Sequence, residues 1–252
     1  MIDVSDPEFW TDLFDVLLEG TLETLWMTSV ALAFTILIGL PLGIVLVGTE
    51  RGRFLEAPFG SRGLGVAINR TLGFVVNLGR SVPFIVLMIA LIPFTRLLVG
   101  SFIGTGPAIV PLTIVAIPFF ARVVEIAVKE VDTGLFEAAE SLGASRWLLV
   151  RRVILPQAAP SIVLGTATTI TSIINFSAMV GVVGGGGLGN VALTYGLQRY
   201  SWIHIVGVIV ILFVVVQLIQ AGANALARRL DHSSGRGESR AALAVDEAER
   251  TA

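Results

Sequence analysis

Cysteine is missing from the 252-residue chain, and charged residues make up only 14% of it. The lack of cysteine excludes disulfides and thiolate metal sites. Soluble domains carry about 25% charged residues, whereas 54% of this sequence is hydrophobic. The composition therefore predicts an integral membrane protein rather than a soluble domain.

Sequence signatures of catalysis are also lacking. Neither of the two histidines, His204 and His232, lies near a carboxylate pair or a second metal ligand in the sequence, and no serine has a plausible base. The chain has no phosphate-binding Gly-Lys-Ser/Thr motif. Its net charge is −2, and the basic residues are spread along the chain. We expect no catalytic site, no metal site, no cofactor bound by this chain and no nucleic-acid partner.

Five apolar stretches are long enough to cross a hydrocarbon core of about 30 Å, which takes about 20 helical residues. Prolines inside them, such as Pro41, Pro83, Pro93 and Pro118, are compatible with a span because neighbouring helices can satisfy the freed carbonyl groups. The fold class that we expect is an all-α membrane protein with five transmembrane helices. The stretches lie near residues 22–47, 72–95, 107–129, 158–182 and 203–227.

Basic residues alternate between the connections that join these stretches. The connections over 48–71 and 130–157 and the residues after 227 each hold several, whereas residues 1–21 and 97–106 hold none. Connections rich in Lys and Arg stay in the cytoplasm. We therefore expect a multi-pass protein with its N-terminus outside and its C-terminus in the cytoplasm.

The chain divides into three parts on this interpretation. Residues 1–20 are expected to form an extracytoplasmic N-terminal segment, and residues 21–230 the transmembrane domain. Residues 231–252 are polar and charged, so we expect a disordered cytoplasmic tail. The first cytoplasmic connection, over 48–70, is either irregular or a surface helix that continues into the second span.

Residues 137–144 form a polar, helix-like stretch between two long apolar segments. Asp132 or Thr133 can cap a helix there by accepting a hydrogen bond from its first turn. Gly143 suits the left-handed position just after the helix end. The helical period places five apolar residues on one face of this helix: Leu135, Phe136, Ala138, Ala139 and Leu142.

A second short helix is expected to follow at a corner. Ser145 can cap it, and Pro156 lies where the next span would begin. The charge pattern places this corner in the cytoplasm. Two interpretations remain for a polar island of this kind: it contacts a soluble partner, or it lies as an amphipathic helix on the lipid headgroups.

The same stretch resembles the EAA loop of permeases from ATP-binding-cassette (ABC) importers. The resemblance rests on Glu137-Ala138-Ala139, a glycine four residues later, and Ile154-Leu155-Pro156. Further segments resemble the methionine-importer branch, and the likeness covers roughly residues 20 to 225. These segments are Arg80–Ile85, Ile92–Arg96, Ile109–Thr113, and Ser177–Met179 with Gly187–Gly189.

The resemblance implies the type I importer permease fold, in which the loop over about 130–156 contains a cytoplasmic coupling helix that docks on an ATPase. It also implies a homodimer in the inner membrane, two cytoplasmic ATPase subunits that use ATP and Mg, and an extracytoplasmic binding protein that delivers D-/L-methionine. The ATPase-docking residues would be Glu137, Ala138, Ala139, Leu142, Gly143 and Ala144.

Two groups of residues inside the spans are candidates for the substrate pathway. Arg80, beside Asn77 in the second span, either faces the bundle interior and shapes the pathway or extends toward the cytoplasmic headgroups. In the fourth span, Phe176 and Met179 share a face near Ser177, and a thioether and an aromatic ring suit an apolar amino-acid side chain. Ordinary packing of small hydroxyl residues is the alternative for this span.

A glycine-rich stretch over 184–189 follows on the outer side and is either a tight, re-entrant loop or a flexible connector. Three other functions compete with the methionine permease. They are a permease of the same family for another amino acid or small polar solute, an ATP-independent secondary transporter, and a scaffold protein. A secondary transporter normally places ionisable residues in its spans, and apart from Arg80 the middle thirds of the five stretches have none.

Overall fold

The computed structural model describes residues 7–230, so the predicted tail over 231–252 lies outside the described residues. All regular structure in the described part is helical. The α-helices are α1 (Pro7–Gly48), α2 (Arg62–Ser81), α3 (Phe84–Ala90), α4 (Ile92–Val99), α5 (Thr105–Lys129), α6 (Thr133–Ser141), α7 (Arg146–Leu149), α8 (Leu155–Val180), α9 (Gly187–Val191) and α10 (Trp202–Leu230). A 3₁₀ turn η1 (Pro58–Gly60) and three π-helical turns, η2 (Val150–Ile154), η3 (Gly181–Gly185) and η4 (Ala192–Gln198), join them.

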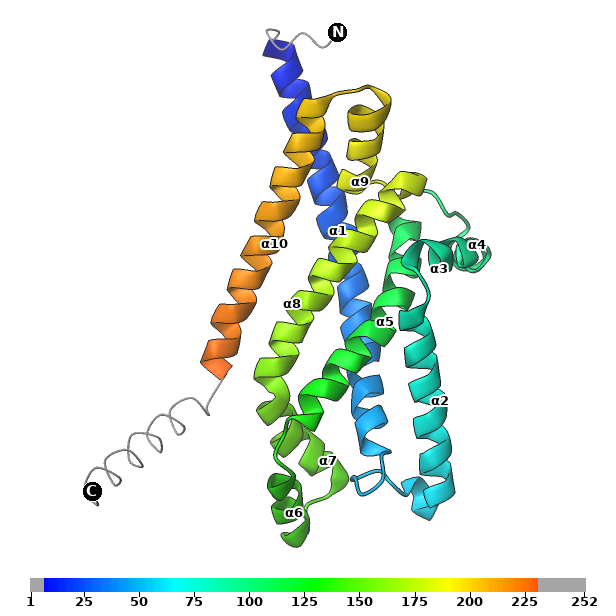
Figure 1. Ribbon diagram of the computed structural model, residues 1–252, viewed down its shortest axis with the longest axis vertical. Coiled ribbons are helices and arrows are strands. Elements are labelled where there is room, and N and C mark those ends of the chain that lie inside the picture. The colour runs from blue at the N-terminus through cyan, green and yellow to red at the C-terminus, as the bar shows by residue number, and fades with distance from the viewer. Residues whose placement is uncertain (1–6, 231–252) are drawn as a thin grey trace, which may run out of the picture.

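The long helices lie side by side (Figure 1). Helix α1 packs most extensively on α5, α5 packs on α8, and α8 packs on α10, while α2 flanks α5. The short helices α6 and α7 lie at one end of the bundle, next to the connection between α1 and α2 (Figure 1). Helix α9 lies at the opposite end, where α1 begins (Figure 1).

The second predicted span, near residues 72–95, is formed by a bent pair of helices. Four helical runs in the described part are long and apolar enough to cross a membrane, and α2 with α3 makes a fifth only as a pair bent by 108°. The bend falls at Val82, whose backbone is extended (φ −84°, ψ 130°). Pro83 causes it, because proline removes a helical N–H and disfavours helix in the residue before it.

The first helix extends well beyond the stretch over 22–47 that the sequence predicted. Helix α1 has 42 residues and is therefore about 63 Å long at 1.5 Å per residue. Hydropathy detects only the part that is apolar, whereas the helix continues through the acidic residues before it. The division of the chain at residues 20 and 230 stays a prediction.

Small residues allow α1 to approach α5 closely. Gly39 and Gly43 are four residues apart on α1, which places them on the same face. A Cβ atom built on Gly43 would lie 2.6 Å from both the Ala121 carbonyl oxygen and the Val124 Cβ of α5. Backbones approach through such small residues in membrane helices, so α1 and α5 form the tightly packed centre of the bundle.

The glycine-rich connection between α8 and α9 has a defined backbone that is hydrogen-bonded to α1. The Gly187 N–H donates to Glu23 Oε2 at 2.6 Å, and the Leu188 N–H donates to Thr24 Oγ1 at 2.9 Å. Gly187 has φ +72°, and a Cβ there would meet the Met27 and Thr24 side chains. Of the two predicted alternatives, the structure shows the tight loop. The side chains of Glu23 and Thr24 on α1 hold it in place.

Replacing Glu23 by alanine is expected to destabilise this end of the bundle. Glu23→Ala leaves the Gly187 N–H without its acceptor, and an unsatisfied buried donor costs about 1–3 kcal/mol. Thermal unfolding of the purified protein should show a lower Tm. Glu19→Ala is the matched control, because Glu19 is exposed one turn earlier on α1; equal effects of the two variants would contradict the assigned role of Glu23.

Candidate functional site

The corner between α6 and α7 forms as the sequence predicted. Of the two candidate caps, Asp132 accepts a hydrogen bond through Oδ1 from the Gly134 N–H at 2.7 Å. Gly143 is left-handed with φ +73°, and the Ala144 N–H donates to the Ala139 carbonyl oxygen at 3.0 Å. This bond across six residues is the one that closes a helix on a left-handed glycine. Ser145 Oγ accepts from the Leu148 N–H at 3.3 Å and starts the next helix.

Phe136 anchors α6 to the bundle. Its side chain is only 8% exposed and stacks on Phe54 of the α1–α2 connection, with ring centroids 6.3 Å apart and planes 16° apart. The Arg53 guanidinium lies 5.2 Å from the centroid of the Phe136 ring. Phe136 and Leu149 belong to the same buried cluster as Val47 of α1. The corner is therefore part of the core at this end rather than a loop attached to it.

The predicted apolar face of α6 is only partly correct. Phe136 is buried and Ala139 packs against the same core cluster, but Leu135 and Ala138 are exposed and Leu142 is 87% exposed. The helix has nine residues, so one buried side chain, Phe136, is enough to pack it against the bundle. The other apolar side chains can therefore stay exposed. Together with Trp147 and Leu148, which are also exposed, these residues leave an apolar surface on the corner. We call Leu135, Ala138, Leu142, Trp147 and Leu148 the corner surface.

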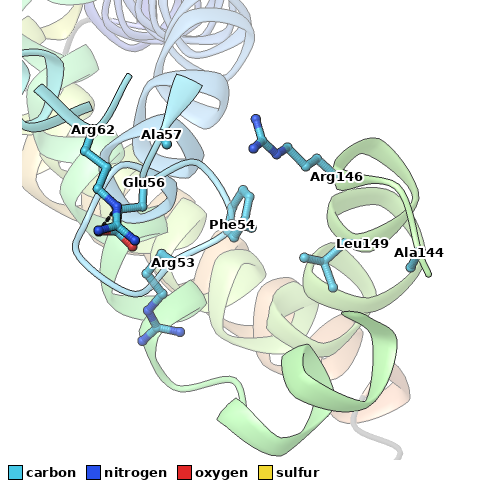
Figure 2. Close-up of a pocket in the computed structure, with 8 residues that line it drawn as sticks. All are labelled: Arg53, Phe54, Glu56, Ala57, Arg62, Ala144, Arg146 and Leu149. Carbon is cyan, nitrogen blue, oxygen red and sulfur yellow. Dashed lines mark ion pairs between the residues drawn. The ribbon is translucent and has the colours of Figure 1, made fainter. Parts of the chain in front are cut away.

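An exposed apolar surface of this kind marks a contact with a protein or with a membrane. Glu137 is exposed on the same helix. A hollow of about 330 Å³ opens beside the corner, between α7 and the α1–α2 connection (Figure 2). Figure 2 shows the Arg146 side chain extending from the start of α7 toward the wall that Ala57 lines. Ala144, predicted as a docking residue, lines this hollow.

The corner continues directly into α8. The turn η2 is π-helical and joins α7 to α8, so that the helix continues from Arg146 until the backbone leaves helical geometry at Val183 and Gly184. Pro156 lies in the first turn of α8, as predicted, but it does not interrupt the helix. A π turn bonds residues five apart, which accommodates a proline that lacks an N–H. Helix α7 of the corner and helix α8 therefore belong to one continuous helix.

The residues predicted for a substrate pathway are divided between two places. Arg80 and Asn77 line a hollow of about 400 Å³ between α1, α2 and α5. Phe176 stacks on Phe84 at the start of α3, with centroids 4.6 Å apart. The Ser177 hydroxyl is buried and donates to the Ile174 carbonyl oxygen of its own helix, whereas Met179 is exposed. Arg80 and Asn77 thus line the same hollow. Ser177 and Met179 do not share an environment, because Ser177 is buried and Met179 is exposed.

Sequence reasoning missed a charged cluster at the end of α5. Glu125 is only 3% exposed, and its Oε1 accepts hydrogen bonds from Arg122 at 2.5 Å and from Lys129 at 2.8 Å. The Lys129 ammonium also lies 2.6 Å from Oε1 of Glu50, which follows the end of α1. The spacing of three and four residues is visible in the sequence, but Glu125 and Lys129 lie outside the middle third of the predicted span over 107–129.

Residues 39–232 match the family described as binding-protein-dependent transport system inner membrane component. The chain belongs to this family. A relative from Vibrio cholerae described as a probable D-methionine transport system permease protein, MetI, is 50% identical over 86% of this chain and 93% of its own length. The corresponding protein of Pasteurella multocida is 46% identical over 84% of this chain and 94% of its own length.

Solved structures agree with this membership. The structure described as inward-facing conformations of the MetNI methionine ABC transporter has a chain 40% identical in sequence, with a TM-score of 0.82 over 90% of this chain and 99% of its own. A structure of an amino acid ABC transporter is 22% identical with a TM-score of 0.70 and shows the fold alone. The predicted family and the type I importer fold are confirmed. The chain is a membrane-spanning permease subunit, located in the inner membrane, and ATP hydrolysis belongs to a partner subunit.

Proposed function

We propose that this permease imports methionine as a homodimer with two cytoplasmic ATPase subunits. An extracytoplasmic binding protein delivers the D or L enantiomer. The observation that carries this proposal is the 50% identity to the V. cholerae methionine permease across nearly the whole length of both proteins. The ATPase uses ATP and Mg, and this chain contributes the membrane pathway and the corner that the ATPase moves.

The corner between α6 and α7 is the surface on which the ATPase docks. Its exposed side chains include the apolar corner surface, with Glu137 beside it, and Gly143 keeps the turn free of a side chain that a partner would have to avoid. When the ATPase dimer closes, the force on α6 passes through Phe136 and Phe54 to α1 and through η2 to α8. One contact thereby moves two separate helices of the bundle.

The charge distribution supports a cytoplasmic location for the corner. The connections at that end contain Arg51, Arg53, Arg146 and Arg151, whereas Arg199 lies in the connection at the opposite end, beside the acidic first turns of α1. Positively charged connections stay on the cytoplasmic side. The N-terminus is therefore outside and the C-terminus is in the cytoplasm.

The missing cysteines make this orientation simple to test. Leu142 at the corner and Tyr200 at the opposite end are each 87% exposed, so a single cysteine at either position would be accessible. In cells that produce the permease without its ATPase, we expect a membrane-impermeant maleimide to label Tyr200→Cys while the cells are intact and Leu142→Cys only after the membrane is opened. Labelling of Leu142→Cys in intact cells would reverse the orientation and remove the docking proposal.

Transport itself is tested in proteoliposomes that contain this permease, its ATPase and its binding protein. We expect labelled L- and D-methionine to accumulate only when ATP is supplied on the ATPase side. Excess unlabelled methionine should abolish the uptake, whereas histidine at the same concentration should leave it unchanged. Preferential uptake of another solute would contradict the substrate, and uptake without ATP would favour a secondary transporter.

A further inference from the structure

The hollow between α1, α2 and α5 is lined by an acidic and a basic side chain that each have a polar group without a partner in the described part of the chain. Glu125 Oε2 is buried and has no hydrogen-bond partner in the described part of the chain, although Oε1 of the same carboxylate has two. Arg80, on the facing helix α2, has no ion-pair or hydrogen-bond partner among residues 7–230. Both side chains line the same hollow of about 400 Å³.

A purely structural role explains only part of this cluster. The bonds of Glu125 to Arg122 and Lys129, and the contact of Lys129 with Glu50, join α5 to α1 and need one carboxylate oxygen of Glu125. They leave Glu125 Oε2 unsatisfied, and a buried polar group without a partner is costly. They also give Arg80 no function, although a charged residue inside a membrane helix is itself costly. A ligand that carries both an ammonium and an oxyanion satisfies both groups.

The other residues that line the hollow indicate which kind of ligand it suits. Leu46, Phe74 and Val76 supply an apolar side to the hollow, and Asn77 adds an amide beside Arg80. Binding sites for small molecules have volumes of about 300–1,000 Å³ and combine apolar walls with a few placed polar groups. The chemistry of this wall matches an α-amino acid with an apolar side chain.

We infer that the hollow is a binding site for a free amino acid on the release side of the permease. Arg80, together with Arg122, binds the carboxylate, a rotation of the buried Glu125 side chain presents Oε2 to the ammonium, and the side chain of the ligand lies on Leu46 and Phe74. A thioether makes favourable contacts with an aromatic ring, so methionine is the expected occupant. This inference rests on the proposed function, and it adds a site distinct from Phe176 and Met179.

The test uses the complete transporter of permease and ATPase in nanodiscs, without the binding protein. A diazirine analogue of L-methionine is photocrosslinked, and modified residues of the permease are mapped by mass spectrometry. We expect crosslinks near residues 46 and 74–80, with L-methionine as competitor. Two further competitors isolate the charges: L-methioninol lacks the carboxylate, and 4-(methylthio)butanoate lacks the ammonium. Each should protect at least about tenfold more weakly than methionine, because each loses one charge-assisted hydrogen-bonded contact.

Two variants assign the charges to residues. In Arg80→Gln, methionine should protect no better than methioninol, whereas its advantage over 4-(methylthio)butanoate should remain. In Glu125→Gln, the advantage over 4-(methylthio)butanoate should disappear instead. Arg70→Gln is the matched control, because Arg70 is exposed on the same helix and does not line the hollow. A merely structural role of either charge would weaken all three competitors equally.

Several outcomes would overturn the inference. They are crosslinks confined to Phe176 and Met179, unchanged discrimination in Arg80→Gln, and stronger protection by glycerophosphoethanolamine, which would identify a lipid-headgroup site. Glu125→Gln also weakens the bonds of residue 125 to Arg122 and Lys129, so the Tm of this variant is measured alongside. Arg80→Gln breaks no bond of the described chain, so its result alone tests whether the hollow binds the carboxylate. ATP-driven methionine uptake without crosslinks at the hollow would refute this site and leave the proposed function intact.

Discussion

Phe136→Ala is expected to abolish ATP-driven uptake while the transmembrane bundle remains folded. Phe136 is the buried side chain by which α6 is seated, and it stacks on Phe54. Replacing a buried phenylalanine by alanine costs about 3–5 kcal/mol. That free energy is concentrated on a nine-residue helix, so the equilibrium constant for packing α6 on the bundle should fall by about 100-fold or more, since about 1.4 kcal/mol is a factor of ten. Uptake is measured in proteoliposomes, and the bundle is monitored by the elution volume and Tm of the purified permease.

Leu142→Ala distinguishes the packing of α6 on the bundle from the binding of the ATPase to the corner. Leu142 is 87% exposed, so its truncation should leave the Tm of the permease unchanged, while binding of the ATPase weakens because apolar contact area at the corner is lost. Phe136→Ala should weaken ATPase binding and also increase hydrogen exchange of the amides over 133–144. Wild-type uptake in Phe136→Ala would mean that the corner does not transmit the force of the ATPase. An altered Tm in Leu142→Ala would mean that the corner surface is packed within the permease.

Features of the corner that depend on local chemistry could be predicted from the sequence. The left-handed Gly143 and the cap at Ser145 follow from residue types at fixed positions relative to a helix end, and both are present. The burial of Phe136 and the exposure of Leu142 could not be separated in this way, because the helical period places both on one face. Only the position of Phe54, which is 82 positions away in the sequence, decides which of them is covered.

The bend between α2 and α3 could not be predicted from hydropathy or from the presence of proline. Hydropathy treats residues 72–95 as one apolar stretch, but the backbone turns at Val82 because of Pro83. Pro111 and Pro118 in α5 do not break their helix, so the presence of proline alone does not predict a break. What differs is the surroundings: α5 is enclosed by α1, α2 and α8, whereas α3 and α4 lie at the side of the bundle. Neighbouring helices hold a proline-containing helix straight where they enclose it.

Gly43→Val is expected to have the largest effect on folding. The valine Cβ would lie 2.6 Å from the Ala121 carbonyl oxygen and from the Val124 Cβ, and neither atom can move without moving α5. Extra methyl groups in a well-packed core typically cost about 1–3 kcal/mol, and more where the backbone must shift. Helices α1 and α5 share the largest interface of the bundle, so separating them also displaces Phe54, Glu50 and the seat of α6. We expect little or no monodisperse permease on size-exclusion chromatography.

The matched control for this prediction is Gly222→Val, the same substitution inside the long helix α10. A Cβ on Gly222 meets no atom within 4 Å, so this variant should retain the wild-type elution volume and Tm. The comparison separates the close approach of two helices from the lower helix preference of valine, which both variants share. If Gly43→Val eluted and melted like Gly222→Val, the glycines of α1 would not be what allows α5 to pack, and the route from the corner through Phe54 to α1 would lose its rigid support.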